Sequence, residues 1–241
     1  MTAGARDLVV LGVPMGRFQT NCYVIGDRST GSCVVVDPGE TADQRLPAII
    51  EQLGCTVDAI LLTHAHVDHV WSVPQLAAQW DVGVHLHPED RWLFAGPQLS
   101  YGQHGTDELV RRYDLDWQPD MDRLVDVHEG QTLTAGGVAF HVAHTPGHTP
   151  GHVTYLGQGL ADAHVELVAG GPSAHEQMLL SGDLLFAGSV GRSDLVGGDG
   201  VRLIAEIHRT AMTLDDAVPV LSGHGPGTTI GHERRTNPFL R

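Results

Sequence analysis

The first part of the chain alternates short apolar runs with polar turns. The runs Leu8–Val13, Cys22–Ile25 and Cys33–Val36 are rich in β-branched residues and are separated by Gly, Asp, Ser and Thr. Such runs predict three consecutive antiparallel strands. A further buried strand is predicted at Ala59–Leu62, because four apolar residues follow one another there.

Apolar residues at helical spacing occur between and after these strands. Leu46 to Leu53 repeat at this spacing, and Gly54 follows as a C-cap, while Pro47 predicts that the regular helix begins late. Helices are also predicted at Val73–Trp80 and at Val201–Ala211, where apolar residues fall on one face.

The order of strands, helix and strand returns in the second half. Extended patterns occur at Gly83–His87, Val138–His144, around Leu179 and at Pro219–Leu221. This alternation predicts an α/β protein of two sheets packed face to face with helices outside. In such an arrangement the functional residues lie on loops at one edge of the sheets.

We expect one domain over residues 1–241, because no linker divides the chain and this length is common for a single domain. Two long segments, Phe94–Asp122 and Gly157–Glu176, show no regular pattern. The first is predicted to form a lid and the second a surface insertion.

Composition and charge restrict the partners. The formal net charge is −15, and the fourteen basic residues are all arginine with no run longer than two, so nucleic acid is excluded as a partner. No apolar run is long enough to span a membrane, and no signal peptide is visible. Three widely spaced cysteines indicate no disulfide framework. We therefore expect a cytoplasmic protein, a monomer or small homo-oligomer, that acts on a small molecule.

A dense group of potential metal ligands follows the strand at Ala59–Leu62. In the segment His64-Ala-His66-Val-Asp68-His69, alternate spacing lets His64 and His66 point the same way toward one cation such as Zn²⁺. Asp68 and His69 are adjacent and project differently, so the loop can supply ligands to two neighbouring ions. The spacing favours a dinuclear centre over a solvated histidine-rich loop.

Two ions need more ligands than this loop carries, and three later residues have suitable positions. His148, Asp183 and His224 each lie where a predicted strand meets a glycine-containing loop. Glycine permits sharp turns that direct a side chain over the sheet edge. Taken singly, each residue is equally consistent with ordinary turn chemistry.

Together these residues resemble the signature of the metallo-β-lactamase superfamily, His-x-His-x-Asp-His followed by His, Asp and His. The resemblance implies an αββα sandwich with two divalent metal ions, zinc in the first instance and iron or manganese as alternatives. It implies that Asp68 and Asp183 are catalytic, and that a carboxylate rather than a cysteine at 183 argues against a true β-lactamase. The implied ligands are His64, His66 and His148 for one ion and Asp68, His69 and His224 for the other, with Asp183 bridging both.

Within the superfamily, three segments resemble the short bacterial hydroxyacylglutathione hydrolases (the glyoxalase II branch). These are Thr145–Thr149, Gly182–Asp194 and Gly223–Thr229. The resemblance implies a substrate-binding role for Arg192, whose guanidinium suits a carboxylate. Only 17 residues (241 − 224) follow His224, which leaves no room for the C-terminal glutathione-binding region of the longer enzymes, so the thiol carrier stays open.

The implied reaction is hydrolysis of a thioester, such as S-lactoyl-glutathione or an analogous thiol conjugate, by a metal-bound hydroxide. Two alternatives are a lactonase and a mononuclear iron persulfide dioxygenase, which would use only the equivalents of His64, His148 and Asp183. His224 in Gly-His-Gly-Pro favours the hydrolase. Three further histidines, His85, His87 and His152, are expected to have structural or supporting roles.

Overall fold

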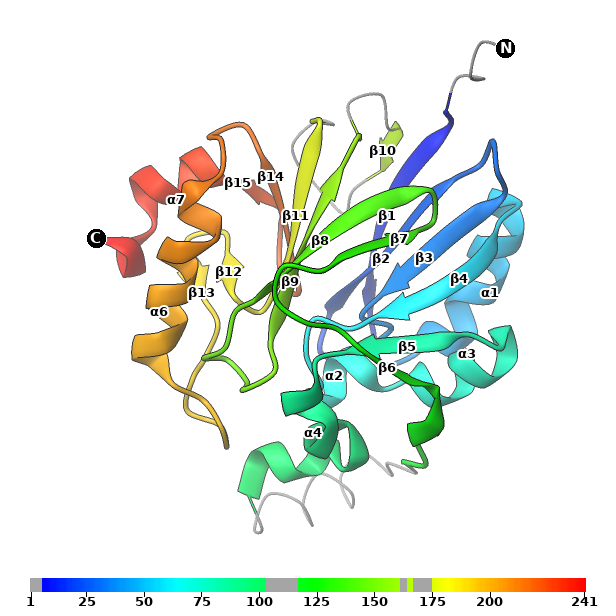
Figure 1. Cartoon of the computed structure of the whole chain (residues 1–241), viewed down its shortest axis with the longest axis horizontal. Coiled ribbons are helices and arrows are strands. Elements are labelled where there is room, and N and C mark those ends of the chain that lie inside the picture. Colours follow the sequence, from blue (N-terminus) through cyan, green and yellow to red (C-terminus); the bar gives the residue numbers. More distant parts are fainter. Residues whose placement is uncertain (1–5, 103–116, 161–163, 167–174) are drawn as a thin grey trace.

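Two β-sheets lie face to face between helices in the computed structural model (Figure 1), which describes residues 6–102, 117–160, 164–166 and 175–241. The strands of the first sheet run in the order β10-β1-β2-β3-β4-β5-β6. The first three predicted strands form antiparallel neighbours, and β4 and β5 continue the sheet in parallel. The bounds are β1 Leu8–Met15, β2 Thr20–Asp27, β3 Ser32–Val36, β4 Thr56–Leu61, β5 Gly83–Leu86, β6 Leu124–Asp126 and β10 His164–Glu166.

The second sheet has the order β15-β14-β11-β9-β8-β7, and a short hairpin of β12 and β13 lies beside it. Val138, Phe140 and Val142 of β8 are buried, while His141 between them is exposed, so β8 shows one face to the core. The bounds are β7 Thr132–Ala135, β8 Val138–His144, β9 Val153–Gln158, β11 Gln177–Gly182, β12 Leu185–Phe186, β13 Ser189–Val190, β14 Pro219–Ser222 and β15 Thr228–Thr229.

Three groups of buried apolar side chains hold the layers together. Between the sheets, residues such as Ile25 and Leu61 of the first sheet pack with Phe140 and Tyr155 of the second. Outside the first sheet, α1 and α3 cover its apolar face. Outside the second, α6 and α7 do the same (Figure 1). The helices are α1 Ala42–Leu53, α2 Val67–Val70, α3 Val73–Trp80, α4 Arg91–Ala95, α6 Gly200–Arg209 and α7 Ile230–Thr236.

This arrangement confirms the predicted αββα sandwich, with one correction at its first helix. Helix α1 begins at Ala42, not late, and Pro47 lies inside it. A proline removes one backbone hydrogen bond, that to the carbonyl of the fourth residue before it. Burial of Ala42 and Leu46 on the core face offsets that loss, and Gly54 caps the end with φ 68° as predicted.

The two segments predicted to be irregular differ from expectation where they are described. The first begins within α4 and continues as a 3₁₀ turn at Pro97–Tyr101, and residues 103–116 of the predicted lid lie outside the described residues. The second contains the end of β9 and the strand β10, which pairs with β1 at the sheet edge. β10 is a strand because it pairs with β1, and such pairing cannot be predicted from the local sequence.

One edge of the sandwich collects the loops that follow β3, β4, β8, β11 and β14. Backbone hydrogen bonds tie the loop after β14 to β2 and to the end of β11, from Asn21 N to the Gly223 carbonyl and from Gly223 N to the Gly182 carbonyl. The loops therefore form one connected surface. No described helix has the length and apolar character needed to cross a bilayer.

Candidate metal centre

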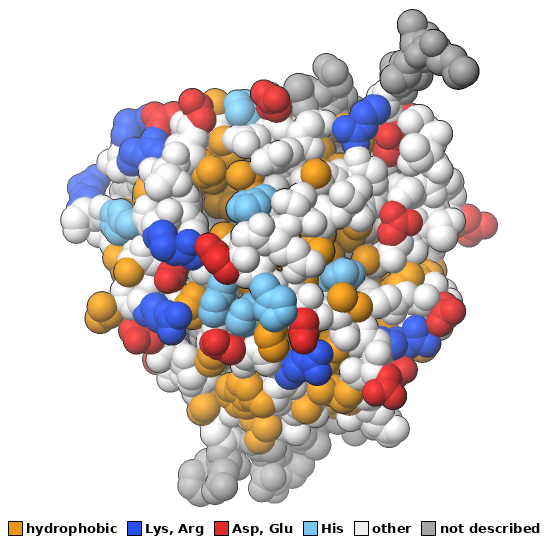
Figure 2. All heavy atoms as spheres, viewed as in Figure 1, with side chains coloured by type: hydrophobic (Ala, Val, Ile, Leu, Met, Phe, Trp, Pro, Cys, Tyr) orange, Lys and Arg blue, Asp and Glu red, His pale blue; other side chains and the backbone are white. Residues whose placement is uncertain are grey.

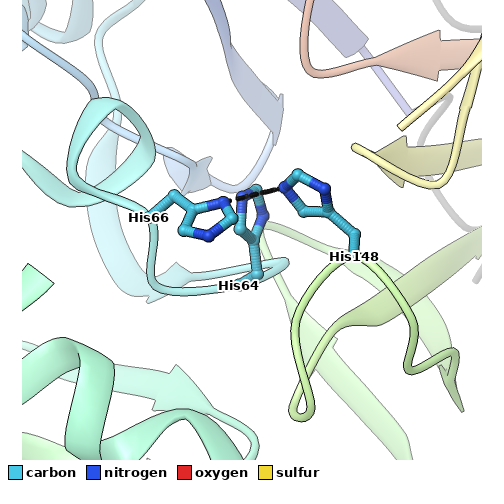
Figure 3. A group of neighbouring side chains, drawn as sticks. All are labelled: His64, His66 and His148. Carbon is cyan, nitrogen blue, oxygen red and sulfur yellow. Dashed lines mark hydrogen bonds between the residues drawn. The ribbon is translucent and has the colours of Figure 1, made fainter. Parts of the chain in front are cut away.

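His64 and His66 come from the loop after β4, and His148 comes from the loop after β8 (Figure 3). Their nitrogens converge: His66 Nδ1 lies 2.8 Å and His64 Nε2 lies 3.2 Å from His148 Nε2. Ligands at zinc–nitrogen distances of about 2.0–2.1 Å in a tetrahedron are about 3.3 Å apart. The three rings therefore have a spacing suited to one ion.

A second group lies beside the first. His69 Nε2 is 3.3 Å from His224 Nε2, and His224 Nε2 is 3.1 Å from Asp68 Oδ2. His69 is completely buried, whereas Asp68 and His224 are partly exposed. Helix α2 begins directly after His66, and this turn separates the side chains of His66, Asp68 and His69 into the two groups.

Asp183 lies between the groups. Its Oδ1 is 3.4 Å from His69 Nε2, and its Oδ2 is 3.5 Å from His148 Nε2 and 3.7 Å from His224 Nε2. The structure thus brings together all seven residues that the sequence singled out. Gly223 makes this possible, since a Cβ there would overlap the Asp183 carboxylate and lie 2.7 Å from His69 Cε1.

Asp37, directly after β3, orients two of these histidines. Its carboxylate accepts hydrogen bonds from His69 Nδ1 at 3.0 Å, from Thr63 N at 2.8 Å and from Thr63 Oγ1 at 2.6 Å. Because the Thr63 hydroxyl donates to Asp37, it accepts from His64 Nδ1 at 3.0 Å. Both histidines then carry a proton on Nδ1 and turn Nε2 toward the centre.

The remaining supports come from the second half of the chain. His148 Nδ1 donates to the Arg192 carbonyl at 2.7 Å, which again leaves Nε2 facing the centre. His152 is not among the converging groups: its Nε2 accepts from Asp183 N at 3.2 Å, and its Nδ1 lies 2.9 Å from Thr145 Oγ1. His152 therefore positions the loop of Asp183.

Asp90 is a buried carboxylate that joins the two loops of the first group. It accepts hydrogen bonds from Ala65 N at 3.1 Å, Thr149 Oγ1 at 2.7 Å and Gly151 N at 2.6 Å. Burial raises its pKa to about 6, although the three hydrogen bonds favour the ionised carboxylate and so act to lower the pKa. Its partners lie up to 61 residues away, so no local pattern could reveal this role.

Burial and charge give the site groups distinct protonation states. Burial, together with neighbouring histidines, holds the pKa of His64 well below its usual value and that of His66 at about 3. At the second group, burial by itself would lower the pKa of His69 and raise those of Asp68 and Asp183, but the attraction between these groups outweighs burial. There, the carboxylates of Asp183 and Asp68 raise the pKa of His69, and the charge of His69 lowers the pKa of both carboxyls.

These residues fit divalent cations. Unprotonated imidazole nitrogens facing one another at 2.8–3.2 Å need a cation or a proton between them. Among the described residues, the buried Asp183 Oδ1 also finds no hydrogen-bond partner, and an anionic oxygen in this position suits a cation. Three imidazoles in one group, and two with a carboxylate in the other, are donor sets typical of zinc and iron.

The centre forms the floor of a cavity of about 450 Å³. Phe18, Tyr101, Phe186 and Leu195 contribute apolar wall, and Arg192 stands among them. The Arg192 guanidinium is more than half exposed and pairs with both oxygens of Asp194, at 2.7 and 2.8 Å. A small molecule with a polar reacting group and apolar parts would suit this cavity.

Two sheets with a His/Asp centre at their shared edge match a known family. The sequence model of the metallo-beta-lactamase superfamily matches residues 15–161. The chain belongs to the metallo-β-lactamase superfamily. The chain is similar to hydroxyacylglutathione hydrolase GloC of Haemophilus influenzae, which is 34% identical over 95% of this chain and 96% of its own length.

Two solved structures superpose on nearly the whole chain. The B3 metallo-beta-lactamase BLEG-1 is 36% identical and superposes with a TM-score of 0.77, over 95% of this chain and 98% of its own. TTHA1623 in a di-iron-bound form is 36% identical with a TM-score of 0.73, over 95% of this chain and 99% of its own. Both structures support the same fold.

Proposed function

We propose that this superfamily member is a dinuclear metal-dependent hydrolase of small thioesters. The observation that carries the proposal is the pair of ligand groups around Asp183, at the floor of a cavity with apolar walls and one arginine. The seven ligands are the residues named from the sequence. Zinc and iron both suit the donors, and the di-iron form of TTHA1623 supports testing iron beside zinc.

When bound, two divalent ions supply an acidified water as nucleophile and polarise a carbonyl. The chain's own residues prepare this chemistry. Asp68 Oδ2 accepts a hydrogen bond from Thr20 Oγ1 at 3.1 Å, which fixes the carboxylate against His224. Asp37 and the Arg192 carbonyl keep the imidazole N–H groups turned away from the reacting centre.

The walls of the cavity determine how the substrate lies. Phe18 and Phe186 exclude water from the floor, which strengthens electrostatic contacts there. Arg192 binds a carboxylate of the substrate in place of Asp194, since both compete for the same two N–H groups. A thiolate leaves readily from the tetrahedral intermediate, so no separate general acid is required.

The name of the GloC relative supports the thioester proposal, because that protein is called a hydroxyacylglutathione hydrolase. The identity of the thiol is a separate question. Arg192 is one cation, and glutathione carries two carboxylates, so we propose a thiol conjugate with at least one carboxylate. The three free cysteines of the chain support a reducing, cytoplasmic location.

The test is a panel of lactoyl thioesters on protein loaded with zinc or with iron. Lactoyl-glutathione carries two carboxylates and lactoyl-N-acetylcysteamine carries none. Release of the thiol is measured with a colorimetric thiol reagent. Asp183→Asn should abolish release, whereas His208→Ala, an exposed histidine on α6, should leave it unchanged. Absence of thiol release from every thioester with either metal would contradict the proposal.

A β-lactam is the second candidate substrate, because BLEG-1 is a B3 metallo-beta-lactamase at 36% identity. A chromogenic cephalosporin on the same zinc-loaded protein distinguishes the two: we expect turnover of the thioester to exceed that of the cephalosporin by at least about 100-fold in kcat/KM, roughly 2.7 kcal/mol.

A further inference from the structure

We propose a peripheral site for one divalent transition-metal ion, such as Zn²⁺, formed by His87, Glu89 and His144. One potential ligand atom from each of the three lies within 4.8 Å of the others. None of them belongs to the seven residues of the metal centre. Two imidazoles and a carboxylate are a ligand set that suits zinc, with water completing a tetrahedron.

The three side chains come from two segments that are far apart in sequence. His87 follows β5 directly and is buried, and Glu89 stands two residues later in the 3₁₀ turn Pro88–Asp90 and is exposed. His144 is the last residue of β8. The His87 and His144 rings stack with centroids 3.8 Å apart, and Glu89 Oε2 lies 3.9 Å from His144 Nε2.

This arrangement is open to solvent on one side. Glu89 is exposed, His144 is partly exposed, and the exposed His128 lies with its ring centroid 6.0 Å from that of His87. Histidine side chains gather near the end of β8 on the face drawn in Figure 2. An ion can therefore reach the group from solution, and His128 is positioned to add a further nitrogen.

The protonation of the rings favours ion binding. His144 Nε2 donates to the Pro150 carbonyl at 2.8 Å, so Nδ1 carries the free lone pair. Burial and the nearby His144 lower the pKa of His87 to about 4, and an unprotonated ring is the form that binds metal. The hydrogen bond from Glu89 N to His87 Nδ1 is long, at 3.3 Å. Little is therefore lost if the ring changes tautomer and Nδ1 no longer accepts this bond.

Coordination by both rings requires one of them to turn out of the stack. The ring torsion χ2 of histidine has a broad profile, so this rotation costs little. Glu89 reaches its position from a side chain that is about half exposed (55%), and it can follow the ion. The group is therefore close to a ligating arrangement but is not held in it.

Both histidines are connected to the metal centre through short pieces of backbone. His87 begins the turn that ends in Asp90, which binds Ala65 N and Gly151 N. His144 directly precedes the loop that carries His148, and its own backbone is held by Glu129 and Arg209. An ion between His87 and His144 would fasten these two loops together from outside. The site is thus a stabilising one, not a second reaction centre.

The test uses full-length protein whose metal centre is already saturated with zinc, titrated with further Zn²⁺. We expect wild type to bind one more zinc per chain than His87→Gln, and Glu89→Gln to bind that zinc at least about 10-fold more weakly. His141→Gln, an exposed histidine on the same strand β8, is the matched control and should bind like wild type.

A thermal readout tests the stabilising role and does not depend on the reaction. At about 100 times the dissociation constant, the additional zinc should raise the unfolding midpoint of wild type by about 5–10 °C. Glu89→Gln, which changes only an exposed side chain, should show about half of this rise or less even if His87→Gln folds poorly. Equal affinity of wild type and Glu89→Gln for the additional zinc, or loss of that zinc in His141→Gln, would overturn the proposal.

Discussion

Replacement of Gly223 by alanine tests how closely the loops of the metal centre must approach. Gly223 has ordinary backbone angles, so an alanine is not strained by its φ. Its Cβ, however, would overlap the Asp183 carboxylate and lie 2.7 Å from His69 Cε1. An ordinary contact begins at 3.4 Å, so His69 must retreat by at least 0.7 Å (3.4 − 2.7), and Asp183 must move further.

The size of the effect follows from that displacement. Metal ligands tolerate about 0.2 Å of displacement, and a shift of about 1 Å at a reacting centre costs about 100-fold in rate. We therefore expect Gly223→Ala to lower kcat/KM by about 100-fold or more and to lower metal content. The assay measures thiol release and metal per chain on the same preparation.

Gly83→Ala is the matched control, because the nearest atom to its Cβ would be a methyl group of the exposed Val125 side chain, at 3.1 Å, and the Arg123 carbonyl lies at an ordinary contact distance of 3.8 Å. We expect its kcat/KM to stay within about twofold of wild type. If Gly223→Ala kept full metal content and wild-type turnover, the close packing of Asp183 against this loop would have no catalytic importance and the reasoning would be refuted.

Three further predictions concern Asp90, Arg192 and His87. Asp90→Ala leaves three donors without an acceptor and should lower the unfolding free energy by about 3–5 kcal/mol in urea titrations; a change below about 1 kcal/mol would contradict the bracing role. Arg192→Gln should raise KM for a carboxylate-bearing thioester by about 10-fold with little change in kcat, and unchanged KM would exclude the contact. His87 has a pKa of about 4 when folded and 6.5 when unfolded, so the unfolded chain takes up its proton first, and stability falls as the pH drops from 6.5 to 4. His87→Gln should flatten that fall, and identical pH profiles would show that burial does not shift this pKa.

The ligands of the metal centre were predictable because they are marked locally. His64, His66, Asp68 and His69 form a dense motif after a strand, and later ligands follow strands at glycine turns. The order of strands and helices likewise predicted the two-sheet fold, because apolar spacing reports which face of each element is buried.

The supports of the centre were not predictable in this way. Asp37 acts on Thr63, which lies 26 residues away, and Asp90 acts on Thr149, 59 residues away. Their roles depend on which strands become neighbours, and this is a tertiary property. The same reason applies to the pairing of His87 with His144, which the sequence separates and the two sheets bring together.

For helix α1 the local sequence was misleading, because the prediction gave Pro47 too much weight. Pro47 predicted a late start, yet the helix begins five residues earlier, at Ala42, because the packing of its apolar face against the first sheet outweighs one missing hydrogen bond.

The most direct test of the two-metal account measures metal content and thioester turnover together in wild type and His224→Ala. His224 contacts Asp68, His69 and Asp183 and belongs only to the second ligand group. We predict two ions per chain with thiol release for wild type, and about one ion with at least about 100-fold lower turnover for His224→Ala. One iron per wild-type chain with oxygen uptake on a persulfide, or two ions and full turnover in His224→Ala, would contradict the account.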